Sequence, residues 1–590
     1  MNKINLEIIK TKIFYFTPII SGIFFYIIIN LINIIFFKLN LLSSIYIISD
    51  IIFFVFISYI LFLFSKKINI FLIIQFIILL TIQVSDSIKT AFFGAPIIMD
   101  DVFSAKEAII AIWMINPIFV VLIIIALSII VLVLILNFKF RKSGLVLFII
   151  LMLFIISLNI FSKQYDSIIN KADVSYLFWN QQENYKHEGP FMYFIDQYIR
   201  SDNKKEIPKQ QTVEDALNSI GKNKILSSYP FSSTIASSLK PLPNIYFILV
   251  ESLWDPKLLN NSSYSQDPFY KDFRDLRNQS KDNFLVSPTF EGKTADPEFE
   301  LLCGIPVLNN SVVFQTELKN NLACLPNILS ELGYETNAFH PDYANFFNRT
   351  NAYKKIGFKN YFSLNDFNMD DLNDGKLSDQ SFLNQAYDLA NKNNNNSKPK
   401  FNYYMTLSTH IPYSLNSKRP HIITNNINND WINNYSNSIY YSTKEISEFV
   451  DKIRKNDQNS IIIITGDHLP FLGMNQEVYK KTNTLNELTL HSTPLIFINK
   501  NKIENVGHVN MFRFGEQILN KIGVETKDTL LDLFNIEELN NIRPLYVDKT
   551  TPEYVKLSNS FNSILSTSQL SNFSIIYNDL LFGKQYSIKK

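Results

Sequence analysis

The chain has little charge of either sign in excess. Its 590 residues carry 55 Lys and Arg against 53 Asp and Glu, which gives a net charge of +2. The basic excess lies in residues 1–165, which hold 12 basic and six acidic side chains, and the rest of the chain is slightly acidic. This distribution argues against a basic face for nucleic acid.

Cysteine is also scarce, since Cys303 and Cys324 are the only two. In a cytosolic protein, two such cysteines are usually free buried thiols. If this part of the chain lies outside the cytoplasm, a disulfide closing a loop of about 20 residues is favoured instead, worth roughly 3 kcal/mol.

The N-terminal part lacks a small-residue cleavage site after its first apolar run, which excludes a removable signal peptide. Several apolar runs have the length needed to cross roughly 30 Å of hydrocarbon. Buried helices of a soluble domain are disfavoured, because such helices are ordinarily ~10–14 residues long. We predict five transmembrane helices, near residues 13–37, 45–64, 68–84, 116–137 and 144–161.

Basic side chains mark one side of these predicted spans, which orients them by the positive-inside rule. They precede the first span and fill the loops after the second and the fourth: Lys3, Lys10, Lys12, Lys66, Lys67, Lys139, Arg141 and Lys142. The N-terminus is therefore expected in the cytoplasm and everything from about residue 165 outside it. We predict a membrane domain at 1–165, juxtamembrane helices and a linker at 166–240, a catalytic domain at 241–545, and a C-terminal extension at 546–590 packed on that domain.

Strand and helix patterns alternate through the outer domain, which predicts an α/β sandwich with a largely parallel sheet. The expected strands are 244–250, 335–339, 403–407, 460–465 and 494–498, and the expected helices begin at Asp296 or cover 325–332, 382–390, 435–453 and 511–522.

Two of these strands end on side chains that bind metals. Residues 244–250 are followed by Glu251, and residues 460–465 are followed, after Gly466, by Asp467 and His468. In α/β sheets, ligands bind beyond the carboxyl ends of the strands. If the strands are neighbours, two carboxylates and an imidazole converge there, which is a reasonable site for zinc or manganese. Between them, a Gly turn presents Thr294 at the start of a helix, where a hydroxyl nucleophile is favoured by the helix dipole.

Five motifs together carry a resemblance to a known family. In order they are Glu251 in V-E-S-x-W-D, Thr294 in G-K-T-x-x-x-E-F, His340 in F-H-P-D with Arg349 soon after, His410 in T-L-S-T-H-I-P-Y, and Asp467 and His468 in I-T-G-D-H. Each motif is weak alone, and G-K-T without an upstream Gly is no P-loop. As an ordered set they resemble the sulfatase-like phosphotransferases of the alkaline phosphatase superfamily, in particular the membrane phosphoglycerol transferases that include lipoteichoic acid synthase.

The resemblance implies an extracytoplasmic sulfatase-like domain and one divalent metal ion, with Mn²⁺ expected first and Zn²⁺ or Mg²⁺ as alternatives. Matched by motif, the metal ligands are Glu251, Thr294, Asp467 and His468, and Thr294 is also the nucleophile that carries the phosphoryl group. His340, Arg349 and His410 match the family's substrate-side residues.

The same resemblance implies phosphatidylglycerol as lipid donor and a location in the bacterial inner membrane, with the catalytic domain periplasmic or extracellular. One departure is Phe347, which stands where lipoteichoic acid synthases carry Trp. Cys303 and Cys324 look like the Gram-negative members, in which a periplasmic disulfide is allowed. An envelope glycan or polysaccharide is therefore the expected acceptor.

Other functions are open or excluded to different degrees. A phosphoethanolamine transferase is chemically close, but those relatives usually carry more cysteines. A sulfatase would need a Cys or Ser in C/S-x-P-x-R as the precursor of its nucleophile, and this position holds Thr294 instead. A non-enzymatic membrane scaffold with an inactive domain is disfavoured by the intact set of metal-binding residues.

Overall fold

The computed structural model describes two compact units, residues 1–206 and 207–590. Within them, the described residues are mainly 3–37, 47–63, 67–93, 188–194, 207–227, 242–307, 312–344, 346–373, 375–392, 398–473, 476–484, 492–536, 545–547, 555–557 and 567–589. We describe each unit by itself.

The described part of the first unit includes the long helices α1 (Lys3–Phe37), α2 (Ile47–Leu63) and α3 (Ile68–Phe93). They pack through a small apolar core that includes Tyr26, Phe54 and Leu79. Among the described residues, the structure contains no helix with both the length and the apolar character needed to cross a membrane. The spans expected at 116–137 and 144–161 lie almost entirely outside the described residues, so the five-span arrangement stays a prediction.

The second unit is built on a nine-stranded sheet with the order β12-β3-β10-β9-β2-β8-β4-β5, in which β11 pairs with β10. Its strands are β2 (Ile245–Val250), β3 (Phe284–Val286), β4 (Glu335–Phe339), β5 (Asn360–Phe362), β8 (Lys400–Met405), β9 (Ile461–Gly466), β10 (Ser492–Asn499), β11 (Lys502–Ile503) and β12 (His508–Asn510). The five strands from β9 to β5 are parallel. β2 and β9 are neighbours, so their carboxyl ends lie side by side.

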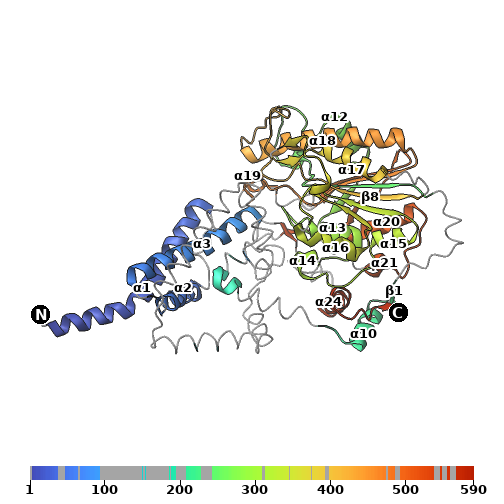
Figure 1. The fold of residues 1–590 in the computed structure, drawn as a ribbon. Coiled ribbons are helices and arrows are strands. Elements are labelled where there is room, and N and C mark those ends of the chain that lie inside the picture. The colour runs from blue at the N-terminus through green and yellow to red at the C-terminus, as the bar shows by residue number, and fades with distance from the viewer. Residues whose placement is uncertain are drawn as a thin grey trace. The chain divides into compact units, whose positions relative to one another are not determined.

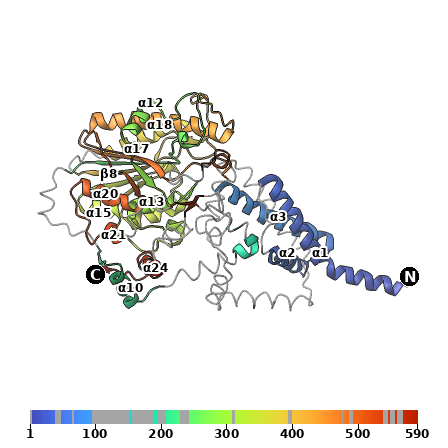
Figure 2. The ribbon, with the colours of Figure 1, turned by 180° about the vertical axis from the view of Figure 1, so that it is seen from behind.

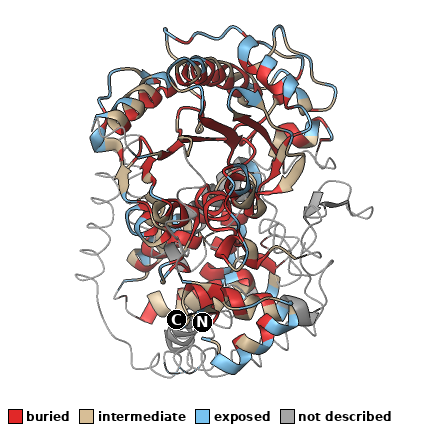
Figure 3. Cartoon of the chain, turned by 90° about the vertical axis from the view of Figure 1, so that its right-hand side faces the viewer, coloured by how far each residue is buried: buried red, intermediate tan, exposed pale blue. Residues whose placement is uncertain are grey.

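Helices cover both faces of this sheet (Figures 1 and 2). One layer is formed by α12 (Lys271–Gln279), α17 (Asp379–Asn391) and α18 (Asp430–Asn456), and the other by α13 (Ala295–Cys303), α15 (Leu325–Glu331), α16 (Arg349–Ile356), α20 (Phe514–Lys521) and α21 (Leu530–Leu533). Side chains of β2 alternate between the two resulting cores, with Phe247 in one and Ile248 in the other. Burial on both faces explains why this strand is apolar throughout, and Figure 3 shows the sheet strands as buried.

The main elements of the outer domain follow the prediction, with two corrections. The sheet is largely parallel, as predicted, but the strand predicted at 494–498 is β10, which runs antiparallel to β9. The strands β3, β5 and β12 were missed because each has only three residues, too few for a period-2 pattern to stand out.

The C-terminal residues pack on the second unit. Helix α24 (Thr567–Leu581) contributes Phe573, Ile576 and Tyr577 to one of the two cores. Beyond it, β15 (Ile588–Lys589) pairs with β1 (Ile225–Leu226). The end of the chain therefore closes onto the segment at which the second unit begins.

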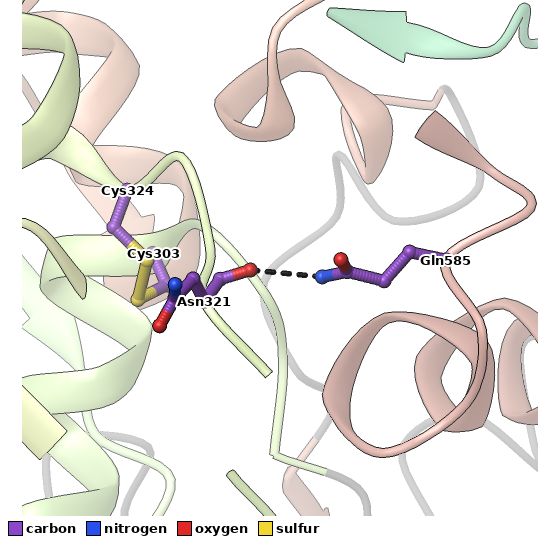
Figure 4. Close-up of a disulfide and its surroundings, with 4 residues drawn as sticks. All are labelled: Cys303, Asn321, Cys324 and Gln585. Carbon is purple, nitrogen blue, oxygen red and sulfur yellow. Dashed lines mark hydrogen bonds between the residues drawn. A yellow bond between two sulfur atoms is a disulfide. The ribbon is translucent and has the colours of Figure 1, made fainter. Parts of the chain in front are cut away.

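The predicted disulfide between Cys303 and Cys324 is present and joins the end of α13 to the residue before α15 (Figure 4). Close by, the side chain of Gln585 donates a hydrogen bond of 2.8 Å to the backbone carbonyl of Asn321. The two cysteines are fully buried.

Candidate metal centre and active site

Glu251 stands directly after β2 and is held at its backbone by the next strand along the sheet. Its N–H donates to Thr406 Oγ1 at 3.1 Å, and Thr409 Oγ1 donates to its carbonyl. Glu251 is 3% exposed, so its carboxylate lies at the edge of the sheet, almost fully shielded from solvent.

Asp467 and His468 follow β9 and meet Glu251 there. One carboxylate oxygen of Glu251 lies 3.8 Å from His468 Nε2, and Asp467 Oδ2 lies 3.2 Å from the same nitrogen. The other ring nitrogen, Nδ1, lies 2.9 Å from the carbonyl of Leu469, so Nε2 is the nitrogen available to a ligand. The ligand atoms of the three residues all lie within 4.8 Å of one another.

The hydrogen bonding of Asp467 shows that the cluster of Glu251, Asp467 and His468 is suited to a cation. Oδ1 accepts the N–H groups of Ser252 at 2.7 Å and His468 at 2.8 Å, whereas the buried Oδ2 accepts none. Burial, and then the charge of Glu251, raise the pKa of Asp467 to about 6. Two adjacent carboxylates and an imidazole are unfavourable without a positive charge between them, and zinc and manganese accept this donor set.

Thr294 reaches the same point from another loop. Glu291, Gly292 and Lys293 all have positive φ, at 58°, 152° and 60°, and this tight turn places Thr294 at the start of α13. Thr294 Oγ1 lies 3.4 Å from His468 Nε2 and makes no capping bond to its own helix. The hydroxyl therefore faces the metal-binding group, and the positive end of the helix dipole lies behind it.

A second group of ionisable side chains lies beside this one. His340 follows β4, and its Nδ1 lies 3.0 Å from the Met405 carbonyl, to which an Nδ1–H donates. Its Nε2 lies 3.9 Å from Asp342 Oδ2. Burial lowers the pKa of His340, with Arg349 adding to the effect. Burial likewise lowers the pKa of His410 to about 4, and the charges that act on it include Lys376, Asp342 and His468. Both imidazoles are therefore neutral at pH 7.

Arg349 begins α16 and is fully buried. Its Nε and one terminal nitrogen donate to Glu298 Oε1 at 3.0 and 2.7 Å, and Tyr353 donates to the other oxygen of Glu298. The remaining nitrogen, Nη1, has no hydrogen-bond partner among the described residues. Burial lowers the pKa of the guanidinium, but Glu298 raises it more, so Arg349 stays charged.

The structure thus brings Glu251, Thr294, Asp467 and His468 together, with the second group beside them; their roles in binding and catalysis stay predictions. Sequence reasoning missed Glu298 as the partner of Arg349, although it lies in the quoted motif around Thr294. It also missed Ser252, whose hydroxyl and N–H contact two of the expected metal ligands. The only signal for Ser252 was its position next to Glu251.

A family model described as Sulfatase matches residues 243–530. The chain is 24% identical over 457 residues to a Rhizobium meliloti protein named for cyclic beta-1,2-glucan modification. The aligned region covers 72% of this chain and 67% of that protein. It is 23% identical to lipoteichoic acid synthase 2 of Bacillus subtilis, over 65% of this chain and 60% of that protein.

Among solved structures, a phosphoglycerol transferase of Streptococcus pyogenes in complex with sn-glycerol-1-phosphate matches with a TM-score of 0.46 and 22% identity, over 64% of this chain and 95% of that one. The sulfatase match covers the sheet, its helices and the whole candidate site, and the relatives extend it toward the N-terminus. The chain thus contains a sulfatase-family domain at residues 243–530 and is similar, over most of its length, to lipoteichoic acid synthase-like proteins.

Proposed function

We propose that the protein is a membrane-bound, metal-dependent phosphotransferase that moves a phosphoglycerol group from phosphatidylglycerol to a cell-envelope glycan or polysaccharide. The observation that carries this proposal is the position of Thr294 Oγ1, 3.4 Å from His468 Nε2 in the buried group of Glu251, Asp467 and His468. The names of the relatives support a glycerol phosphate chemistry and a glycan acceptor.

The residues that would hold the metal are Glu251, Thr294, Asp467 and His468, with Mn²⁺ the expected ion. A divalent ion bound there lowers the pKa of a coordinated hydroxyl and neutralises phosphoryl oxygens.

Thr294 provides the covalent step. Its Oγ1 attacks the phosphorus of phosphatidylglycerol, the bond from phosphorus to the diacylglycerol oxygen breaks, and diacylglycerol leaves with a proton. The phosphoglycerol group stays on Thr294 as a diester. An acceptor hydroxyl then attacks the same phosphorus, and the Thr294 hydroxyl is restored when its proton returns.

The neighbouring residues serve the phosphoryl group and the protons. Arg349 keeps Nη1 available for a phosphoryl oxygen while Glu298 fixes its other two nitrogens. His340 and His410 are neutral and are therefore able to accept a proton from an attacking hydroxyl and return it to a leaving group.

We place the second unit outside the cytoplasm of a bacterium and the N-terminus inside. Support comes from the basic loops of the N-terminal part and from the disulfide, because structural disulfides persist mainly in oxidising compartments.

Purified protein supplied with labelled phosphatidylglycerol and Mn²⁺ tests the proposal by the release of diacylglycerol. Release should stop on addition of a chelator and return with Mn²⁺. Thr294→Ala should abolish it while leaving the fold intact, because a hydroxyl at a helix start contributes only about 1 kcal/mol. The exposed Thr424 gives a matched control, since Thr424→Ala should retain full activity.

A fully active Thr294→Ala variant, or release that is indifferent to the chelator, would exclude this mechanism. Transfer from phosphatidylethanolamine instead of phosphatidylglycerol would favour the phosphoethanolamine reaction, and no transfer from either lipid would favour an inactive scaffold.

A further inference from the structure

Ser252 contacts both acidic residues of the metal centre. Its hydroxyl donates to Glu251 Oε1 at 2.8 Å, and its N–H donates to Asp467 Oδ1 at 2.7 Å. The first bond orients the Glu251 carboxylate. The second occupies Oδ1 of Asp467, whereas Oδ2 accepts no hydrogen bond from the described residues and faces His468 Nε2.

The backbone of Ser252 has a conformation that its sequence does not favour. Its φ of 54° lies in the left-handed region, which is unfavourable for a residue other than Gly and persists only where the surroundings enforce it. In a relaxed extended conformation, the N–H and the hydroxyl of Ser252 would no longer point at Asp467 and Glu251 together.

Tyr435 is the group that holds this turn. It lies on α18, is fully buried, and places its hydroxyl 2.7 Å from the carbonyl of Ser252 and 2.9 Å from the carbonyl of Trp254. The same hydroxyl accepts the N–H of Trp254 at 3.0 Å. One phenol therefore binds the chain at the left-handed residue and two residues beyond it, and ties the turn to α18.

We propose that Ser252, held by Tyr435, is a positioning residue that preorganises Glu251 and Asp467 for a divalent cation. The inference rests on the metal centre of the proposed function. Partners that orient ligands in this way typically change metal affinity by 10–100-fold when they are removed.

The test is a calorimetric titration of the metal-free, full-length protein with Mn²⁺. Ser252→Ala keeps the backbone N–H but loses the hydroxyl bond to Glu251, and should weaken Mn²⁺ binding about 10-fold or more. Ser252→Gly loses the same bond but relieves the left-handed strain, so it should bind Mn²⁺ as weakly while folding at least as stably. Tyr435→Phe should weaken binding in the same direction, because the turn is no longer held.

Two controls match these changes away from the site. Ser460 is buried at the opposite end of β9, and its hydroxyl donates to the Asp457 carbonyl. Tyr441 lies on the same helix as Tyr435, and its hydroxyl donates to the Pro420 carbonyl. Ser460→Ala and Tyr441→Phe should leave Mn²⁺ affinity unchanged. In turnover assays, excess Mn²⁺ should restore the rate of Ser252→Ala but not that of Thr294→Ala.

The outcomes separate this inference from the proposed function. Wild-type protein that binds no Mn²⁺ would overturn the metal centre itself. Wild-type binding together with unchanged affinity in Ser252→Ala and Ser252→Gly would overturn only the positioning role, and so would a loss of folding stability without a change in affinity.

Discussion

At the scale of single residues, the pairing of Arg349 with Glu298 shows how a buried guanidinium keeps its charge. Glu298 is inaccessible to solvent and receives two guanidinium bonds and the Tyr353 hydroxyl. Glu298 follows Thr294 by one helical turn, since its N–H donates to the Thr294 carbonyl at 3.1 Å. The pair therefore ties α13, the helix that Thr294 precedes, to the start of α16.

Removing one member of this pair should be costly. Arg349→Met leaves Glu298 buried without its cation, and we expect the free energy of unfolding to fall by about 3–5 kcal/mol. The double variant Arg349→Met/Glu298→Gln should recover part of this loss, because no uncompensated charge remains. Urea unfolding followed by circular dichroism measures both. If the single and double variants were equally unstable, the loss would reflect packing and not an unpaired charge.

At the scale of elements, the disulfide acts on the same helix from its other end. Thr294 begins α13, and Cys303 is the last residue of that helix, joined to Cys324 across a sequence separation of 21. Both ends of α13 are thus held, one by the Arg349–Glu298 pair and one by a covalent bond.

The double variant Cys303→Ser/Cys324→Ser should lower the free energy of unfolding by roughly 3 kcal/mol, because the unfolded chain loses the constraint of a closed loop. The measurement is urea unfolding with and without reductant. Reductant should destabilise the wild type to a similar degree and have no effect on the double variant. Equal stability of wild type and variant would show that the bond does not constrain the unfolded chain.

At the scale of the whole molecule, residues 207–590 form one compact unit. Its ends meet where β15 pairs with β1, and α24 completes one of the two cores. The described residues 567–589 are therefore part of a core that also contains Ala295, next to Thr294.

The topology of the whole chain is the remaining prediction at this scale. A phosphatase reporter fused after residue 200 should be active, because alkaline phosphatase needs an oxidising compartment for its own disulfides. A reporter fused after residue 67, between the second and third predicted spans, is the control and should be inactive. Activity in the reverse pattern would refute the proposed orientation, because it would place the second unit in the cytoplasm.

The convergence of Glu251, Asp467 and His468 could be predicted from sequence because each of them follows the end of a strand. The apolar runs before Glu251 and Asp467 mark buried strands, and a polar residue after such a run falls at a sheet edge. The same reasoning did not predict the antiparallel direction of β10, because an apolar strand reads alike in both directions. It also did not reveal Glu298 as the partner of Arg349, since the two are separated by 51 positions.

By itself, the sequence determined the α/β class of the outer domain, the identity of the metal-binding and nucleophile candidates, and the cysteine pair. These features depend on local pattern and on residue type. Only the tertiary structure decided how they work together: that β2 and β9 are neighbours, that Ser252 adopts a left-handed backbone under Tyr435, and that one oxygen of Asp467 is left without a partner. The physical reason is that these contacts join segments that are distant in sequence. They form only when the two cores pack on the sheet, and burial then strengthens their hydrogen bonds.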